Sequence, residues 1–382
     1  MMSSLLQNTM RLAGVAALLS ACGTVPAGNG SPTAPPPAAA LALPGATSTH
    51  VKVAEASASY GAWARASYGA WARATDDLWA STLPGGLRNT FAENLADWEA
   101  IHLAAGQAQA PHLGEGVMVA VVDTGLDLGH PAFADHLADA AHWRDFIGND
   151  AVPQEEDGGT VSGHGTAVAG LILQVAPGAT ILPLRALKAS GETPADTVAA
   201  AVRHAVASGA DIINVSAVSG YDSTLTEAIR EAAEQGVYVT LPTGNDGTRY
   251  VQYPARSSTQ NTTLGQYAIN AGAIRSDYTL TPWTNYGGNL EVLAPGDDLV
   301  TAGLNGTVVA VKGTSFAAPV LAGALALALG EAYSGDDRGR LAQQLGATAT
   351  SVAPNNPNLA AGGSALLGQG AINVGAFLKS VR

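Results

Sequence analysis

Short apolar runs alternate with helical stretches along the chain from about residue 114 onward. The runs are continuous, which is typical of strands buried on both faces of a parallel sheet. The helical stretches are rich in Ala and Val or amphipathic, and two of them are followed within two residues by a Gly, Gly209 and Gly236. The expected strands are Val117–Val122, Ile181–Leu187, Asp211–Val215 and Val237–Leu241, and the expected helices are Gly165–Val175, Pro194–Ser208 and Leu225–Glu234.

Repeated strand–helix units of this length predict an α/β fold, a mostly parallel sheet with helices on both faces. In such sheets the functional groups collect at the carboxyl ends of the strands. A further apolar run, Phe316–Gly330, carries Pro319 and is shorter than the roughly 20 residues that a membrane-spanning helix needs. This run therefore predicts a helix buried inside the domain.

The N-terminus has the pattern of a targeting segment. An apolar run, Leu12–Leu19, follows Arg11 and ends in Leu-Ser-Ala-Cys at Cys22. This ending resembles a bacterial lipobox, in which the Cys is lipidated and becomes the new N-terminus. A plain secretory signal with a Cys near its end is the alternative. Residues 1–21 are thus predicted to be a signal peptide of the lipoprotein type, and the protein is expected to be exported, as a bacterial cell-envelope lipoprotein or in secreted form.

Two segments separate this signal from the alternating pattern. Residues 22–50 are rich in Pro, Ala and Gly, which predicts a flexible linker. Residues 51–100 are expected to be a pro-segment or an N-terminal extension. They contain ASYGAWAR twice in tandem, at 58–65 and 66–73. The repeat is either an aromatic docking segment or a recent local duplication, and two copies are too few for a solenoid.

Charge and cysteine content exclude several function classes. The net charge of −13 argues against nucleic-acid binding and against a polybasic membrane patch. The single Cys excludes an intrachain disulfide framework and a zinc site built from several thiolates. The 382 residues suffice for one large domain or two small ones.

Three motifs lie at predicted strand-to-helix junctions. Asp123 begins D-T-G after the first strand, His164 lies within G-H-G-T at a helix start, and Ser315 lies within G-T-S at the start of the long apolar helix. Taken alone, each motif also has a structural interpretation: D-T-G as a turn, His164 as a structural histidine and Ser315 as a helix cap. An aspartic protease would need two close carboxylates, and D-T-G occurs only once.

Together, in the order Asp, His, Ser, the motifs resemble the subtilisin-like serine proteases. The resemblance runs from about residue 114 to the C-terminus and implies a subtilisin-like three-layer fold, with residues 101–382 as the catalytic domain. The other phrases that carry it are Asp123–Pro131, Asn214–Ser216, Gly244–Gly247, Ala294–Gly296 and Gly368–Asn373.

The resemblance also implies the catalytic roles. Ser315 would attack the scissile carbonyl after His164 takes its proton, and Asp123 would orient His164. Asn245 would donate to the oxyanion together with the backbone N–H of Ser315. This chemistry requires no cofactor.

The substrate-binding residues that the resemblance implies are Ser216, Ala217, Val218 and Gly244. Val218 stands where relatives usually have a glycine that borders the pocket for the residue before the cut bond. Its Cβ narrows that pocket or shifts the strand, so the specificity of relatives does not carry over.

The segment 145–154 resembles a calcium loop of thermitase-like relatives. Asp145, Asp150, the Val152 carbonyl and Gln154 would supply oxygen ligands for a structural calcium ion, with water completing the shell. The alternative is a solvated acidic loop. The calcium loop that many relatives insert in the helix after His164 is expected to be absent.

The leading hypothesis is an exported serine endopeptidase that acts on protein or peptide substrates and is held at the membrane by a lipid on Cys22. The alternative is a catalytically silent, surface-tethered binding protein on the same scaffold.

Overall fold

The folded part of the chain is built around a seven-stranded parallel sheet. The computed structural model describes residues 50–53, 90–259, 264–331 and 339–382. The strands of the sheet are β2 (Met118–Asp123), β3 (Arg144–Asp145), β4 (Thr180–Arg185), β6 (Ile212–Val215), β8 (Tyr238–Pro242), β9 (Ala268–Ile274) and β10 (Val292–Pro295). They lie in the order β10-β9-β8-β6-β2-β4-β3, and each neighbouring pair is parallel. The predicted α/β class and the parallel sheet are confirmed.

Strand β2 is the point at which the winding of the sheet reverses. The chain passes from β2 to β4 on one side and then returns to β6 on the other side of β2. In doubly wound sheets such a reversal opens a crevice at the carboxyl ends of the strands. Asp123 is the last residue of β2 and therefore lies at this crevice.

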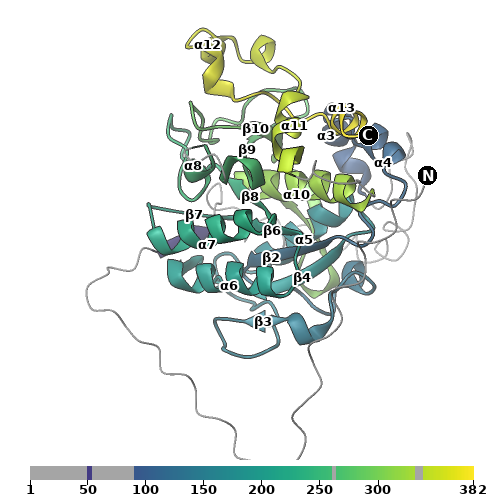
Figure 1. Ribbon diagram of the computed structural model, residues 1–382, viewed down its shortest axis with the longest axis vertical. Helices are drawn as coiled ribbons and strands as arrows, with labels where there is room; N and C mark the ends of the chain where they lie inside the picture. The colour runs from purple at the N-terminus through teal and green to yellow at the C-terminus, as the bar shows by residue number, and fades with distance from the viewer. Residues whose placement is uncertain (1–49, 54–89, 260–263, 332–338) are drawn as a thin grey trace, which may run out of the picture. The chain divides into compact units, whose positions relative to one another are not determined.

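Helices cover both faces of the sheet (Figure 1). The long ones are α5 (His164–Val175), α6 (Ala195–Ala207), α7 (Ser223–Glu234) and α10 (Thr314–Gly330). Val119 and Val121 of β2 pack in the same apolar cluster as α5 and α10. Ala120 and Val122 pack with α6 and α7 in the second cluster. Successive residues of β2 thus point into opposite clusters, which explains why its sequence is continuously apolar.

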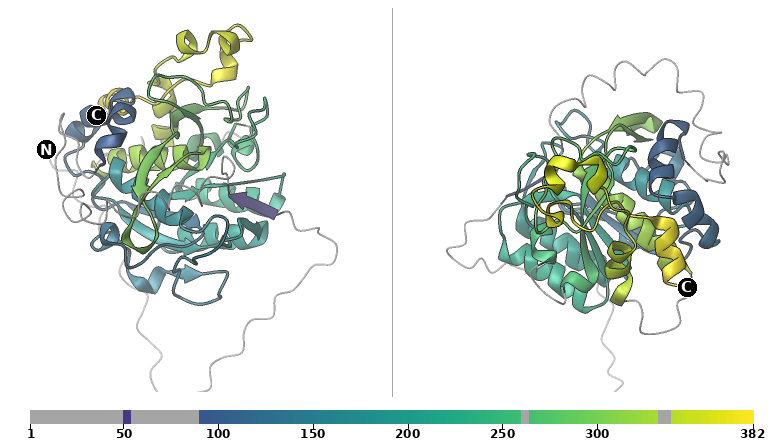
Figure 2. Two further views of the ribbon diagram at one scale, coloured as in Figure 1. Left: turned by 180° about the vertical axis from the view of Figure 1, so that it is seen from behind. Right: turned by 90° about the horizontal axis from the view of Figure 1, so that it is seen from above.

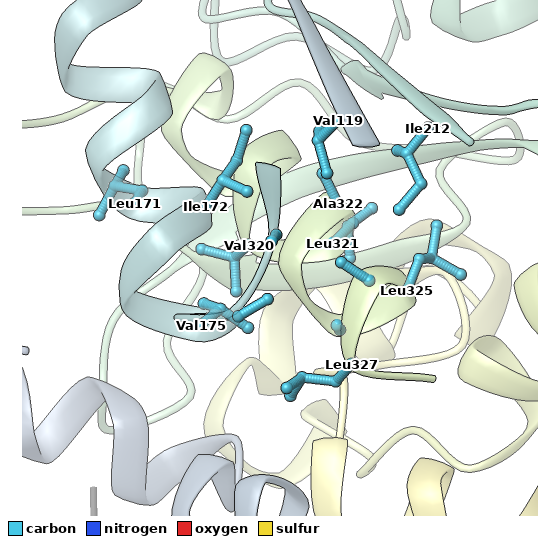
Figure 3. Close-up of a cluster of buried hydrophobic side chains, with 14 of the residues drawn as sticks. Val119, Leu171, Ile172, Val175, Ile212, Val320, Leu321, Ala322, Leu325 and Leu327 are labelled. Carbon is cyan, nitrogen blue, oxygen red and sulfur yellow. The ribbon is translucent and has the colours of Figure 1, made fainter. Parts of the chain in front are cut away.

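The larger cluster is centred on α10. Figure 3 shows Ile172 and Val175 of α5 beside Val320 of α10, and Ile212 of β6 beside Leu325. The side chains from Thr314 to Leu329 are all buried. The prediction of a buried helix is therefore confirmed. Among the described residues, no helix has the length and apolar character needed to cross a bilayer.

Shorter elements complete the body. A three-stranded antiparallel sheet holds β5 (Glu192–Pro194), β1 (His50–Val53) and β7 (Ala217–Ser219), with β1 in the middle. A two-stranded hairpin holds β11 (Leu299–Ala302) and β12 (Val308–Val311). The remaining α-helices are α3 (Leu95–Ala100), α4 (Leu103–Gln109), α8 (Ala255–Ser258), α9 (Leu264–Tyr267), α11 (Leu341–Ala347), α12 (Pro357–Ala360) and α13 (Val374–Ser380).

Residues ahead of the expected catalytic domain are packed into the same body. The Asn94 side chain donates to Gln174 Oε1 and to the Val300 carbonyl, both at 2.8 Å. Trp98 is fully buried, and the Val374 N–H donates to the Ile101 carbonyl at 2.8 Å. The boundary expected between residues 100 and 101 thus falls within packed structure. Cys22, the signal peptide and the tandem repeat lie outside the described residues.

Candidate active site

Asp123 and His164 form a buried pair between β2 and α5. The Asp123 Oδ1 atom accepts the Thr124 N–H at 2.8 Å and lies 2.7 Å from His164 Nδ1. Both side chains are fully buried. Because the carboxylate accepts, Nδ1 is the protonated nitrogen of the ring, and Nε2 is left as a proton acceptor.

Two glycines allow His164 to come so close to β2. Gly163 caps α5 with a φ of 85°, a conformation that L-residues rarely adopt. At Gly165 a Cβ would lie 2.2 Å from the Gly125 carbonyl oxygen and 3.1 Å from Asp123 Cβ. The two glycines of the G-H-G motif therefore let the start of α5 lie close against the turn after β2.

Ser315 lies on the other side of His164. It is the second residue of α10, and its Oγ is 3.0 Å from His164 Nε2. It is also fully buried. The structure thus brings the three predicted catalytic residues into one hydrogen-bonded chain, although Asp123 and Ser315 come from opposite ends of the domain.

The Ser315 carbonyl has an unusual partner for a residue in a helix. Four residues later stands Pro319, which has no N–H to donate to it. The Ser216 hydroxyl donates to this carbonyl instead, at 2.7 Å. Ser216 precedes β7, so this bond fixes β7 relative to the first turn of α10.

Asn245 lies beside the same helix turn. Its Oδ1 accepts the Thr314 N–H at 2.9 Å, and the Thr314 hydroxyl accepts the Gly244 N–H at 3.1 Å. The first of these bonds identifies the carboxamide atom beside Thr314 as the oxygen, so the Nδ2 group lies on the other arm of the carboxamide. Gly244 has a φ of 103°, and a Cβ there would lie 2.2 Å from Gln252 Oε1. Thr314 is a supporting residue that lies within the G-T-S motif but was not predicted to act at the site.

The predicted substrate-binding strand is already paired in this structure. Lys52 of β1 lies opposite Val218 of β7, and Val53 lies opposite Ala217. Figure 2 shows β1 as the purple strand beside the body. The two strands are antiparallel, so the end of β1 lies opposite Ala217, the residue after Ser216. A segment of the N-terminal extension therefore occupies the middle of the β5-β1-β7 sheet.

The four residues predicted to bind calcium lie in one loop, and their oxygen atoms accept hydrogen bonds from the protein. Asp145 Oδ1 accepts two backbone N–H groups of its own loop at 2.7 Å, and Oδ2 pairs with Arg185 Nη1 at 2.7 Å. Asp150 accepts the Val152 N–H at 2.8 Å, the Val152 carbonyl accepts the Gln154 N–H at 2.7 Å, and Gln154 Oε1 accepts another backbone N–H. Arg185 thus balances part of the charge of Asp145, and calcium binding at this loop stays a prediction. In the described ranges no group of three or more His, Cys, Asp or Glu side chains could hold a metal.

One buried charge at the site was not predicted from the sequence. Glu155 is 7% exposed, and burial raises the pKa of its carboxyl to about 7. It stands in the run Gln154–Asp157, which has the composition of a solvated acidic loop. Only its position nine residues before His164 could have drawn attention to it.

Comparison with known proteins agrees with this geometry. Residues 114–363 match the family described as the subtilase family. Subtilisin Savinase of Lederbergia lenta is 33% identical over 235 residues, which cover 58% of this chain and 80% of that protein. A thermophilic serine proteinase of Bacillus sp. (strain AK1) is 31% identical over 253 residues, 63% of this chain and 56% of that protein.

A solved structure gives the same result. The crystal structure of a cold-adapted subtilisin-like serine proteinase superposes with a TM-score of 0.54 at 29% sequence identity, covering 62% of this chain and 84% of that one. The family match covers well over half of the chain and includes Asp123, His164 and Ser315. The chain therefore belongs to the subtilase family of serine endopeptidases.

Proposed function

We propose that this protein is an exported endopeptidase that binds protein or peptide substrates as an extended strand beside β7 and cleaves them with Ser315. The observation that carries the proposal is the position of His164, 2.7 Å from Asp123 and 3.0 Å from Ser315 Oγ. These contacts favour hydrolysis over silent binding. Labelling by a fluorophosphonate probe that is lost in Ser315→Ala is the direct test.

The reaction follows from the proton positions. A serine hydroxyl is a weak nucleophile, so His164 Nε2 takes its proton as Ser315 Oγ attacks the carbonyl carbon. Asp123 holds the ring and stabilises the imidazolium that forms. His164 then gives the proton to the leaving amine. A water molecule, deprotonated by His164, next attacks the acyl-enzyme, which releases the acyl group and restores Ser315.

The oxyanion forms beside the first turn of α10. Backbone N–H groups at a helix start have no partner within the helix, and the positive end of the helix dipole favours negative charge there. We assign the oxyanion contacts to the Ser315 N–H and to Asn245 Nδ2, whose carboxamide is held by Thr314.

The groove between β5 and β7 has a strand on each side, so a substrate there would gain ladder hydrogen bonds from both. The pocket near Ser315 is expected to accept a small side chain. Val218 adds a Cβ on β7, and carboxamide atoms of Gln252 and Asn285 fill the space beside Gly244, where a Cβ would lie 2.2 and 2.4 Å from them.

Strand β1 supports the assignment of the N-terminal extension as a pro-segment, because it fills the groove that a substrate needs. We expect the double variant Val51→Pro/Val53→Pro to raise the activity of the intact precursor about tenfold or more. Proline removes N–H donors, and each lost ladder bond contributes about 1 kcal/mol. Peptide hydrolysis by purified precursor measures this.

The matched control is Val51→Thr/Val53→Thr, since β-branched threonine retains the strand preference and the donors. Its activity should equal that of the unchanged precursor. Equal activity of the proline variant would mean that β1 does not block the groove.

Attachment to the membrane is the second part of the proposal. It rests on Cys22 at the end of the signal peptide. Diacylglyceryl and acyl chains together give stable anchoring. We expect wild-type protein in the membrane fraction, Cys22→Ser in the soluble fraction or unprocessed, and Ser20→Ala unchanged. A wild-type protein that is wholly soluble and secreted would refute the anchor.

A further inference from the structure

Glu155 connects the two elements that carry the catalytic pair. Its backbone N–H donates to the Leu126 carbonyl at 2.9 Å, which attaches it to the loop after β2. Its backbone is so close to Gly125 that a Cβ there would lie 3.0 Å from Glu155 Cα. The side chain points toward the start of α5, where its Oε2 lies 3.2 Å from the Thr166 hydroxyl and 3.4 Å from the Thr166 N–H.

Thr166 is the third residue of α5, so its N–H is one of the helix-start donors. The neighbouring Gly165 N–H donates to the Thr124 hydroxyl at 3.0 Å. The first N–H groups of a helix need acceptors, and Gly163, the N-cap of α5, has no side chain to supply one. Glu155 therefore caps, from another loop, the helix whose first residue is His164.

The charged groups that face Glu155 are Asp123 on β2 and His164 on α5. Asp123 Oδ2 and Glu155 Oε1 are both buried without a hydrogen-bond partner in the described part of the chain. The Asp127 carboxylate, on the loop after β2, accepts a hydrogen bond from the Gly306 N–H. Next along the chain, Glu156 is largely exposed and pairs with Arg185 Nη2 at 2.6 Å. Glu155 thus brings a second carboxylate into the desolvated surroundings of the histidine.

We propose that Glu155 is a positioning residue for the triad: its carboxylate caps α5 so that His164 stays aligned with Asp123, and its negative charge stabilises the imidazolium formed during the reaction. The charge is present when it is needed. Donors that point at a carboxylate stabilise its charged form, and Glu155 Oε2 accepts both the hydroxyl and the N–H of Thr166. The inference rests on the proposed hydrolytic function.

The test is Glu155→Gln, which keeps the size and one acceptor oxygen but removes the charge. We expect kcat to fall about tenfold or more with KM within twofold, because the imidazolium exists only along the reaction path. In the pH profile of kcat/KM, the acid limb should move to lower pH by roughly half a unit to one unit, since the imidazolium loses a neighbouring negative charge. Glu155→Asp, which keeps the charge, should restore the position of that limb.

The matched control is Glu156→Gln, the same change one residue further along on a side chain that pairs with Arg185. Its rate and pH profile should match wild type within twofold. A Glu155→Gln enzyme with a lower melting temperature but an unshifted acid limb, or with wild-type kinetics, would overturn the inference. Absence of hydrolysis by wild type would instead overturn the proposed function.

Discussion

Ser315→Ala is expected to lower the turnover of a peptide substrate by about 10⁶-fold and to abolish labelling by a fluorophosphonate, with little change in binding. Removal of the triad serine lowers kcat by about this factor in the related subtilisin. In this structure Ser315 Oγ lies 3.0 Å from His164 Nε2, and without it the base has no proton to accept. The residual rate would come from the oxyanion donors and from substrate positioning.

His164→Ala tests whether the pair acts as a unit. The fall in turnover in His164→Ala should match that in Ser315→Ala, and the double variant should be no slower than either single variant. Ser351→Ala, a serine exposed on the surface, is the control and should retain wild-type turnover. Strong residual activity in His164→Ala, or labelling of Ser315→Ala, would place the nucleophile elsewhere.

Four of the seven sheet strands (β2, β4, β6 and β8) and the four long helices were predictable because each of them carries its own signal. Strand Val117–Val122 was expected, and β2 occupies Met118–Asp123, one residue later. The short strands β1 and β5 were not predicted, because three or four residues of mixed polarity carry no periodic pattern and are strands only through their partners. The insertion of β1 into the substrate groove is therefore a finding of the structure.

The triad was predictable for a different reason. Each member stands at a junction between a strand and a helix or at a helix start, and its neighbouring glycines give it a recognisable phrase. Charges in loops have no such context. The calcium ligands were expected from the resemblance of residues 145–154 to a calcium loop, whereas Arg185, which pairs with Asp145, lies 40 residues further along the chain. Glu155 was missed because burial depends on the packing of the loop against Gly125, which composition does not reveal.

Asn245→Ala is expected to lower turnover by roughly 100- to 1000-fold, about 2.7–4 kcal/mol, with little change in KM. The reason is that the oxyanion exists only in the transition state, so its donor contributes to kcat. The alanine variant also loses the acceptor for the Thr314 N–H, a bond of 2.9 Å in this structure. Some loss of thermal stability is therefore expected as well.

Asn245→Asp separates the two effects. A carboxylate still accepts from Thr314, so the loop and the start of α10 should remain as stable as in wild type. It has no N–H₂ donor and places negative charge beside the developing oxyanion, so turnover should fall at least as far as in the alanine variant. Asp246→Asn, at the exposed neighbouring position, makes the opposite change in charge and should leave turnover within about twofold. If a well-folded Asn245→Ala enzyme turns over within tenfold of wild type, Asn245 only shapes the turn after Gly244, and the oxyanion must be held by backbone donors alone, with the roles of Asp123, His164 and Ser315 unchanged.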